Sequence, residues 1–238
     1  MAYLYGASDD SGHTENAVFL LDEAGLVRRT YSNDQYPDLP NPAICLRALT
    51  KIAETPRPWP VEEQDWHRGE LTADVTLIEY ADYECRPCRE NHHLLSRILP
   101  DYGNRIVLIH RHLPLKPLHP LAPLAAEAAE SAGAQGCFWE MHDRLFLAEG
   151  ALEREHLDSY AKEIGLNFDQ FTADLDSARF TDRIKEQFLR AIKCKIKLTP
   201  TLFINGILYE GPRTESGFRS VIDPLLESIQ ALKDRHGK

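Results

Sequence analysis

Two cysteines separated by two residues follow an apolar run in the segment ADYECRPCRE, residues 81–90. At this spacing Cys85 and Cys88 can bind a metal, close a structural disulfide or carry redox chemistry. A structural zinc site needs four ligands, and the sequence has no second C-x-x-C motif. The nearby histidines do not follow zinc-finger spacing; they are His92, His93, His110, His112 and His119. The pattern therefore favours redox chemistry and predicts no metal site.

Cys85 lies where a predicted strand ends and a predicted helix begins. The unpaired amide groups of a first helical turn, together with the helix dipole, favour a thiolate, which is the reactive form of cysteine. Pro87 suits that first turn, and Arg86 adds a positive charge next to the thiolate. Cys88 is expected to be buried one turn below. The sequence thus predicts Cys85 as the attacking thiol and Cys88 as the resolving thiol.

Glu79 is a carboxylate inside an apolar strand, six residues before Cys85. Strand alternation leaves two interpretations: a side chain that faces solvent at a sheet edge, or one that faces inward. An inward carboxylate would carry protons for the buried thiol of Cys88.

The elements that must position these residues alternate between strands and helices. Short apolar runs predict strands, and a period of 3.6 residues predicts helices. The predicted order is a strand over 74–81, a helix over 85–99, a strand over 105–113, a helical stretch over about 119–193, a hairpin at Asn205–Gly206 and a helix over 214–234. Pro224 is expected to bend or split the last helix.

The N-terminal part differs in pattern. Ala17–Leu21 and the residues after Gly25 predict a hairpin, and Asn41–Pro42 predict the start of a helix that runs to about residue 54. A proline-rich stretch at residues 55–70 then predicts a linker. We expect a small α+β segment over residues 1–54 and a second domain over 71–238.

The overall composition is that of an ordinary globular chain. Of its 238 residues, 43% are hydrophobic and 27% are charged, and its net charge is −10 with a pI of about 5.5. The acidic balance argues against nucleic acid or an anionic membrane as the main partner. No apolar run in the sequence approaches the length of about 18 residues that a membrane-spanning helix needs. The first residues lack the pattern of a signal peptide, so we expect a cytoplasmic protein, or a periplasmic one only if the true N-terminus lies upstream.

Four blocks in order carry a resemblance to a known family. They are LIEYADYECRPCRE, HRHLPLKPLHPLAPLAAEAA, QGCFWEMHDRLF and TPTLFINGILYEGP. Together they resemble the bacterial DsbA-like thiol:disulfide oxidoreductases. The resemblance implies a thioredoxin-like α/β fold with a helical domain inserted after the second strand, here about residues 119–193.

The resemblance also implies roles for individual residues. Cys85 corresponds to the nucleophile, Cys88 to the resolving thiol and Glu79 to the buried acid. Thr199–Pro200 corresponds to a cis-proline loop that faces the disulfide, where the backbone of Thr199 would pair with an extended substrate peptide. Arg86 and Pro87, between the cysteines, are expected to contact substrate. The segment KCKIKLTP lacks the Gly-Val-x-Gly lead-in that is common before this proline.

The other cysteines are Cys45, Cys137 and Cys194. Free cysteines usually behave as small buried hydrophobes, which is the interpretation we favour for all three over a second redox site. Residues 1–54 resemble the C-terminal third of a peroxiredoxin, on the strength of the stretch 17–49, but the part that carries the peroxide-reacting cysteine is missing. We therefore expect no peroxidase activity.

The sequence as a whole predicts a thiol:disulfide oxidoreductase that acts on protein or small thiol substrates and needs no cofactor. Two alternatives stay open. One is a binding or scaffold module that keeps the cysteines without turnover, and the other is a kappa-type glutathione transferase or isomerase.

Overall fold

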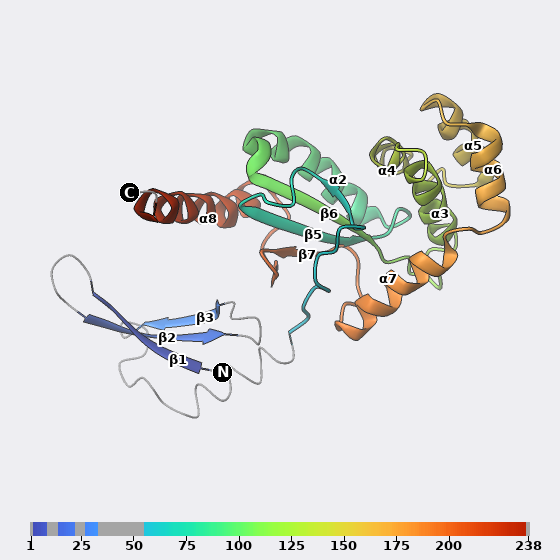
Figure 1. Ribbon diagram of the computed structural model, residues 1–238. Coiled ribbons are helices and arrows are strands. Elements are labelled where there is room, and N and C mark those ends of the chain that lie inside the picture. Colours follow the sequence, from blue (N-terminus) through green and yellow to red (C-terminus); the bar gives the residue numbers. More distant parts are fainter. Residues whose placement is uncertain (1, 9–13, 22–26, 33–54, 237–238) are drawn as a thin grey trace. The chain divides into compact units, whose positions relative to one another are not determined.

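The computed structural model describes residues 2–8, 14–21, 27–32 and 55–236, and the chain divides into two compact units, Met1–Pro56 and Arg57–Lys238 (Figure 1). The first unit contains an antiparallel sheet of order β1-β2-β3, formed by Ala2–Ser8, Thr14–Leu21 and Val27–Ser32. Strands β2 and β3 confirm the predicted hairpin, and β1 adds a strand that the sequence analysis did not predict. The helix predicted before residue 54 lies outside the described residues.

The second unit is built on a mixed sheet of order β4-β6-β5-β7-β8. Its strands are β4 (Trp66–Arg68), β5 (Val75–Ala81), β6 (Ile106–His112), β7 (Thr201–Ile204) and β8 (Ile207–Leu208). Strand β5 lies in the middle, parallel to β6 and antiparallel to β7. Its nearly continuous apolar sequence suits a strand that is covered on both faces.

The two faces of this sheet pack against different helices. Val75 and Leu77 of β5 lie in one apolar cluster with side chains of α2 (Arg86–Ile98) and α8 (Glu215–His236). Ile78 and Tyr80 lie in another cluster with α7 (Thr181–Lys193). Glu79 shares the parity of Val75 and Leu77, so strand alternation directs its side chain toward α2.

The predicted helical insertion lies between β6 and β7 (Figure 1). Its helices are α3 (Ala122–Gly133), α4 (Phe138–Leu147), α5 (Arg154–Glu163), α6 (Phe168–Asp176) and α7. Alanines line the buried face of α3, and their small side chains let the neighbouring helices approach closely. The same cluster contains Cys85 and Cys88. The insertion therefore contributes to the surroundings of the cysteine pair.

The C-terminal elements follow the predicted order, and the structure excludes a split of the last helix. Asn205 and Gly206 both have positive φ angles, 47° and 75°, which is the backbone of a two-residue hairpin turn. Pro224 lies inside α8, yet the helix continues through it as one element rather than two. Proline removes a single helical hydrogen bond, and Phe218, Ile222 and Leu226 keep both halves packed in one apolar cluster.

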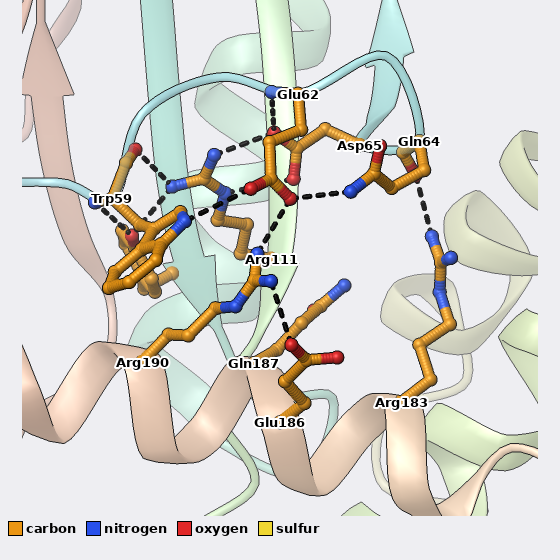
Figure 2. A pocket seen from close by; sticks show the side chains of 10 residues that line it. Trp59, Glu62, Gln64, Asp65, Arg111, Arg183, Glu186, Gln187 and Arg190 are labelled. Carbon is orange, nitrogen blue, oxygen red and sulfur yellow. Dashed lines mark hydrogen bonds and ion pairs between the residues drawn. The ribbon is translucent and has the colours of Figure 1, made fainter.

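The linker predicted at residues 55–70 is in large part integrated in the second unit. Arg111 on β6 is buried and donates from Nε and Nη2 to the two carboxylate oxygens of Asp65, at 3.0 and 2.6 Å. Its guanidinium also donates to the carbonyl oxygens of Trp59 and Pro60, at 2.6 and 2.7 Å. Figure 2 shows Trp59 and Asp65 converging on Arg111. Proline cannot donate a hydrogen bond but its carbonyl accepts one, so a proline-rich segment can still be fixed by a buried arginine.

Helix α7 holds the same segment from the other side. Arg190 pairs with Glu62 at 2.6 Å, and its guanidinium lies 4.8 Å from the ring centre of Trp59 (Figure 2). Beyond Asp65, strand β4 pairs antiparallel with β6. The segment is thus an edge of the fold and not a free spacer.

Candidate active site

Cys85 is the N-cap residue of α2 and is 5% exposed. The pKa of its thiol is lowered to about 6, chiefly by a hydrogen bond with the Cys88 thiol and further by the side chain of Thr199 and the backbone amide of Cys88. Burial and the negative charge of Asp82 oppose this shift. Hydrogen bonds that favour the charged form outweigh the cost of burial, so Cys85 is a thiolate at neutral pH.

Cys88 lies one turn further along α2 and is fully buried. Burial raises the pKa of its thiol well above the usual value, and the neighbouring Cys85 and the charge of Glu79 raise it further. The two cysteines are both free thiols. At neutral pH the pair therefore consists of one reactive thiolate at the helix start and one protonated thiol beneath it.

Glu79 is buried, with 1% of its surface exposed, which decides between the two interpretations left open by the sequence. Its Oε1 accepts a hydrogen bond of 2.7 Å from the side-chain amide of Asn91, and its Oε2 lies 3.8 Å from Nδ1 of His110. The sequence analysis missed Asn91. The sequence could have indicated Asn91, because it is a polar residue three positions after Cys88 and therefore lies on the same buried face of the predicted helix.

The Thr199–Pro200 peptide bond is cis, and its loop faces Cys85. In its protonated form the Cys85 thiol donates a hydrogen bond of 3.6 Å to the carbonyl oxygen of Thr199. The side chain of Thr199 contributes to the lowered pKa of Cys85 through a hydrogen bond. Leu198, the preceding residue, is 73% exposed. The loop therefore presents polar backbone and an apolar side chain next to the reactive sulfur.

Arg86 and Pro87 occupy the first turn of α2 as the sequence predicted, and both are exposed. Arg86 Nε donates to Glu90 at 2.9 Å, and the Arg86 side chain is 83% exposed. Its charge is thus balanced by a neighbouring carboxylate and screened by solvent. Hydrogen bonds to Cys85 are the largest effects that lower its pKa, and the role expected for Arg86 stays a prediction.

Two further acidic side chains, Asp82 and Glu84, lie next to the cysteines. Asp82 is buried, and its Oδ2 lies 2.8 Å from Nδ1 of His119. Glu84 accepts hydrogen bonds from the backbone amides of Leu121 and Ala122 at 2.7 and 3.0 Å, at the start of α3. These contacts tie the loop before Cys85 to the helical insertion.

The remaining cysteines differ in position. Cys137 and Cys194 are half-buried free thiols that flank α4 and α7. Burial raises the pKa of Cys194. Cys45 lies outside the described residues. The charge of Arg111 lowers the pKa of Cys194, but burial outweighs it, so the pKa shift of Cys194 is opposite to that of a reactive thiol.

Several solved structures share this fold. BdbD from Bacillus subtilis in its oxidised form superposes with a TM-score of 0.64 at 21% identity, covering 72% of this chain and 97% of that one. Wolbachia pipientis alpha-DsbA1 superposes with a TM-score of 0.62 at 22% identity, covering 73% of this chain and 96% of that one. A thioredoxin-like oxidoreductase from Silicibacter pomeroyi superposes with a TM-score of 0.61 at 25% identity, covering 70% of this chain and 94% of that one.

Curated relatives match in sequence over a limited region. A protein named Na(+)/H(+) antiporter NhaA 1 from Salinispora arenicola is 40% identical over 173 residues, which are 71% of this chain and 26% of that protein. The antiporter NhaA of Herminiimonas arsenicoxydans is 40% identical over 144 residues, 60% of this chain and 23% of that protein. The chain thus spans about a quarter of the length of these relatives. Within the described ranges, none of the helices has the length and apolar character to cross a membrane.

The family model described as thioredoxin matches residues 62–224, which contain the whole mixed sheet, the cysteine pair and the helical insertion. This match covers more than half of the chain. The chain belongs to the thioredoxin family, and its second unit has the DsbA-like form of the fold, in which helices are inserted between the second and third strands of the thioredoxin sheet.

Proposed function

We propose that this chain is a thiol:disulfide oxidoreductase that works through a Cys85–Cys88 couple. One observation carries the proposal: the pKa of Cys85 is lowered to about 6 while that of Cys88 is raised well above its usual value. An attacking thiol needs a large thiolate fraction at ambient pH, whereas a resolving thiol must stay protonated until the mixed disulfide has formed. The family and the fold support the same reaction class.

The reaction proceeds in two exchanges. The Cys85 thiolate attacks a substrate disulfide; one S–S bond breaks, a Cys85–substrate disulfide forms, and the first substrate thiolate leaves and takes up a proton from water. The Cys88 thiol then loses its proton toward Glu79 and attacks the sulfur of Cys85. The second substrate thiol is released. The substrate has gained two electrons, and the chain holds a Cys85–Cys88 disulfide. The reverse sequence oxidises a substrate dithiol.

The substrates we propose are protein disulfides or small thiols held in extended form. Backbone groups of Thr199 are near Cys85, so an extended peptide can pair with this loop while its disulfide meets the thiolate. The exposed side chain of Leu198 offers apolar contact beside it. Antiport is not part of the proposal, since the antiporter relatives are matched over only about a quarter of their length.

The test measures reduction of a peptide disulfide in a glutathione buffer. Cys85→Ser should abolish turnover, and Cys88→Ser should accumulate a mixed disulfide that gel electrophoresis without reductant detects. Cys137→Ser removes a half-buried free thiol outside the pair and should leave turnover unchanged. Activity that survives Cys85→Ser would contradict the assignment of the nucleophile.

The non-catalytic alternative makes a different prediction in the same assay. A binding or scaffold module would show no turnover in the wild-type chain even though its thiols react with an alkylating reagent. A glutathione transferase would conjugate glutathione in the Cys88→Ser variant as fast as in the wild type. Either result would replace the proposal.

A further inference from the structure

A group of metal-binding side chains lies outside the cysteine pair, at the contact between α2 and α4. His92 on α2 and His142 and Asp143 on α4 place one donor atom each within 4.8 Å of one another. Nε2 of His92 lies 3.8 Å from Oδ1 of Asp143. Donors of a tetrahedral zinc ion with bonds of about 2.0–2.2 Å are about 3.3 Å apart. Small side-chain rotations therefore bring the three donors to bonding distance.

Both imidazoles are buried, His142 at 1% exposure and His92 at 7%. Imidazole nitrogen is a common ligand of zinc.

One donor oxygen of this group lacks a partner in the protein. Oδ1 of Asp143, the oxygen that faces His92, is buried and accepts no hydrogen bond. Oδ2 of the same carboxylate accepts from Arg68 at 2.7 Å. A carboxylate oxygen without a donor is costly to bury. A cation at this position would satisfy it, while Arg68 holds the other oxygen.

The surroundings supply the remaining parts of a metal site. The hydroxyl of Tyr83 lies 3.1 Å from Nδ1 of His142 and fixes the orientation of that ring, as partners of metal-bound histidines commonly do. Phe146 stacks on His92 at 4.8 Å between ring centres. On the other side, Asp143 and Ser96 line a surface pocket. An ion can enter there, and a water molecule can complete its coordination.

We propose that His92, His142 and Asp143 bind one divalent zinc ion, with water as the fourth ligand. Two imidazoles, one carboxylate and an open position form a donor set that suits zinc. The ion links α2, which carries Cys88, to α4 of the helical insertion. It therefore stabilises the contact between these two helices. The site is independent of the cysteine chemistry. Sequence spacing predicted no metal site, because 50 residues separate His92 from His142.

The test is calorimetric titration of zinc chloride into the full chain with Cys85→Ser and Cys88→Ser, which removes the thiols that could compete. We expect about one high-affinity zinc per chain, and a melting temperature that rises with zinc. In the same background, Asp143→Asn keeps the size of the side chain and His92→Phe keeps the aromatic contact with Phe146. Each should weaken zinc binding about tenfold or more and remove the thermal shift.

His93→Phe is the matched control, since His93 is the exposed neighbour of His92 on the same helix. It should bind zinc as the parent does. Should His92→Phe fail to fold, Asp143→Asn decides, because that side chain is 38% exposed and its replacement leaves packing intact. No zinc binding by the parent, or equal binding by the parent and Asp143→Asn, would overturn the proposal. Because both thiols of the pair are absent here, neither result depends on the proposed exchange activity.

Discussion

The sulfur of Cys85 lies 3.6 Å from the carbonyl oxygen of Thr199, 114 residues further along the chain. Strand β7 follows Pro200 directly and pairs with β5, whose C-terminal end leads to Cys85. The sheet therefore brings the loop and the thiol together. This contact places the side chain and the backbone of Thr199 beside the reactive sulfur.

Thr199→Val should raise the pKa of Cys85 above about 6, because the side chain of Thr199 contributes to lowering it. Valine has the same shape but cannot donate a hydrogen bond to the thiolate. The ultraviolet absorbance of the thiolate, followed as a function of pH, measures the shift. Thr172→Val is the control, since its hydroxyl is buried as well but lies on α6 and has no part in the pKa of Cys85. Equal titration curves for the two variants would contradict the role of Thr199.

The reactivity of Cys85 should rise with pH around 6. Alkylation by iodoacetamide requires the thiolate, so its rate should reach half of its plateau near that pH. Unfolded cysteine titrates near 9. Because the pKa of Cys85 is lower in the folded state than in the unfolded state, its ionisation stabilises the reduced fold. This contribution is fully present above pH 9 and is lost as the pH falls through about 6.

The stability of the reduced chain should therefore increase between pH 6 and 9 relative to Cys85→Ser, which lacks the titrating thiol. Urea unfolding of both proteins across this range measures the difference. A difference that stays constant with pH would show that Cys85 titrates alike in the folded and unfolded states.

Glu79→Gln should slow exchange near neutral pH while the fold survives. Glutamine keeps the size of the side chain and can still accept the hydrogen bond from Asn91, but it cannot take up the proton of Cys88. Exchange rates from pH 5 to 9 (about the range in which such groups titrate) and circular dichroism are the measurements. Glu90→Gln, an exposed carboxylate on α2, is the control. Rates unchanged by Glu79→Gln at every pH would exclude proton transfer by this residue.

Asp65→Ala should destabilise the second unit by about 3–5 kcal/mol, because it leaves the buried guanidinium of Arg111 without its carboxylate. Denaturant unfolding measures this free energy. Glu63→Ala, an exposed residue of the same segment, should change it by less than about 0.5 kcal/mol. Similar stabilities for both variants would mean that Arg111 finds other partners.

The ion pair of Asp65 and Arg111 determines how many residues can be removed from the N-terminus without loss of stability. Removal of residues 1–56 keeps Asp65, β4 and the cysteine pair, so disulfide exchange should remain. Removal of residues 1–68 deletes Asp65 and β4 and should lower stability strongly. The two truncated proteins should therefore differ in unfolding free energy. If both are equally stable and active, the segment that surrounds Arg111 contributes nothing to the fold.

Local sequence determined much of this protein. The Cys85–Cys88 pair at a strand-to-helix junction, the central strand around Glu79 and the turn at Asn205–Gly206 all follow from short-range rules. Each depends on residues a few positions apart, where backbone sterics and side-chain periodicity act directly. The order of strands and helices around the insertion follows from the same rules.

Tertiary structure alone decided which of these residues meet. Alternation left the direction of Glu79 open; the packing of α2 on β5 buries it against Asn91. The prolines before Trp66 indicated a linker, yet Arg111, 46 residues after Asp65, fixes that segment on the sheet. Such contacts depend on how whole elements pack, and the energy that selects a packing is shared among many side chains distant in sequence. The spacing of residues along the sequence does not reveal these contacts.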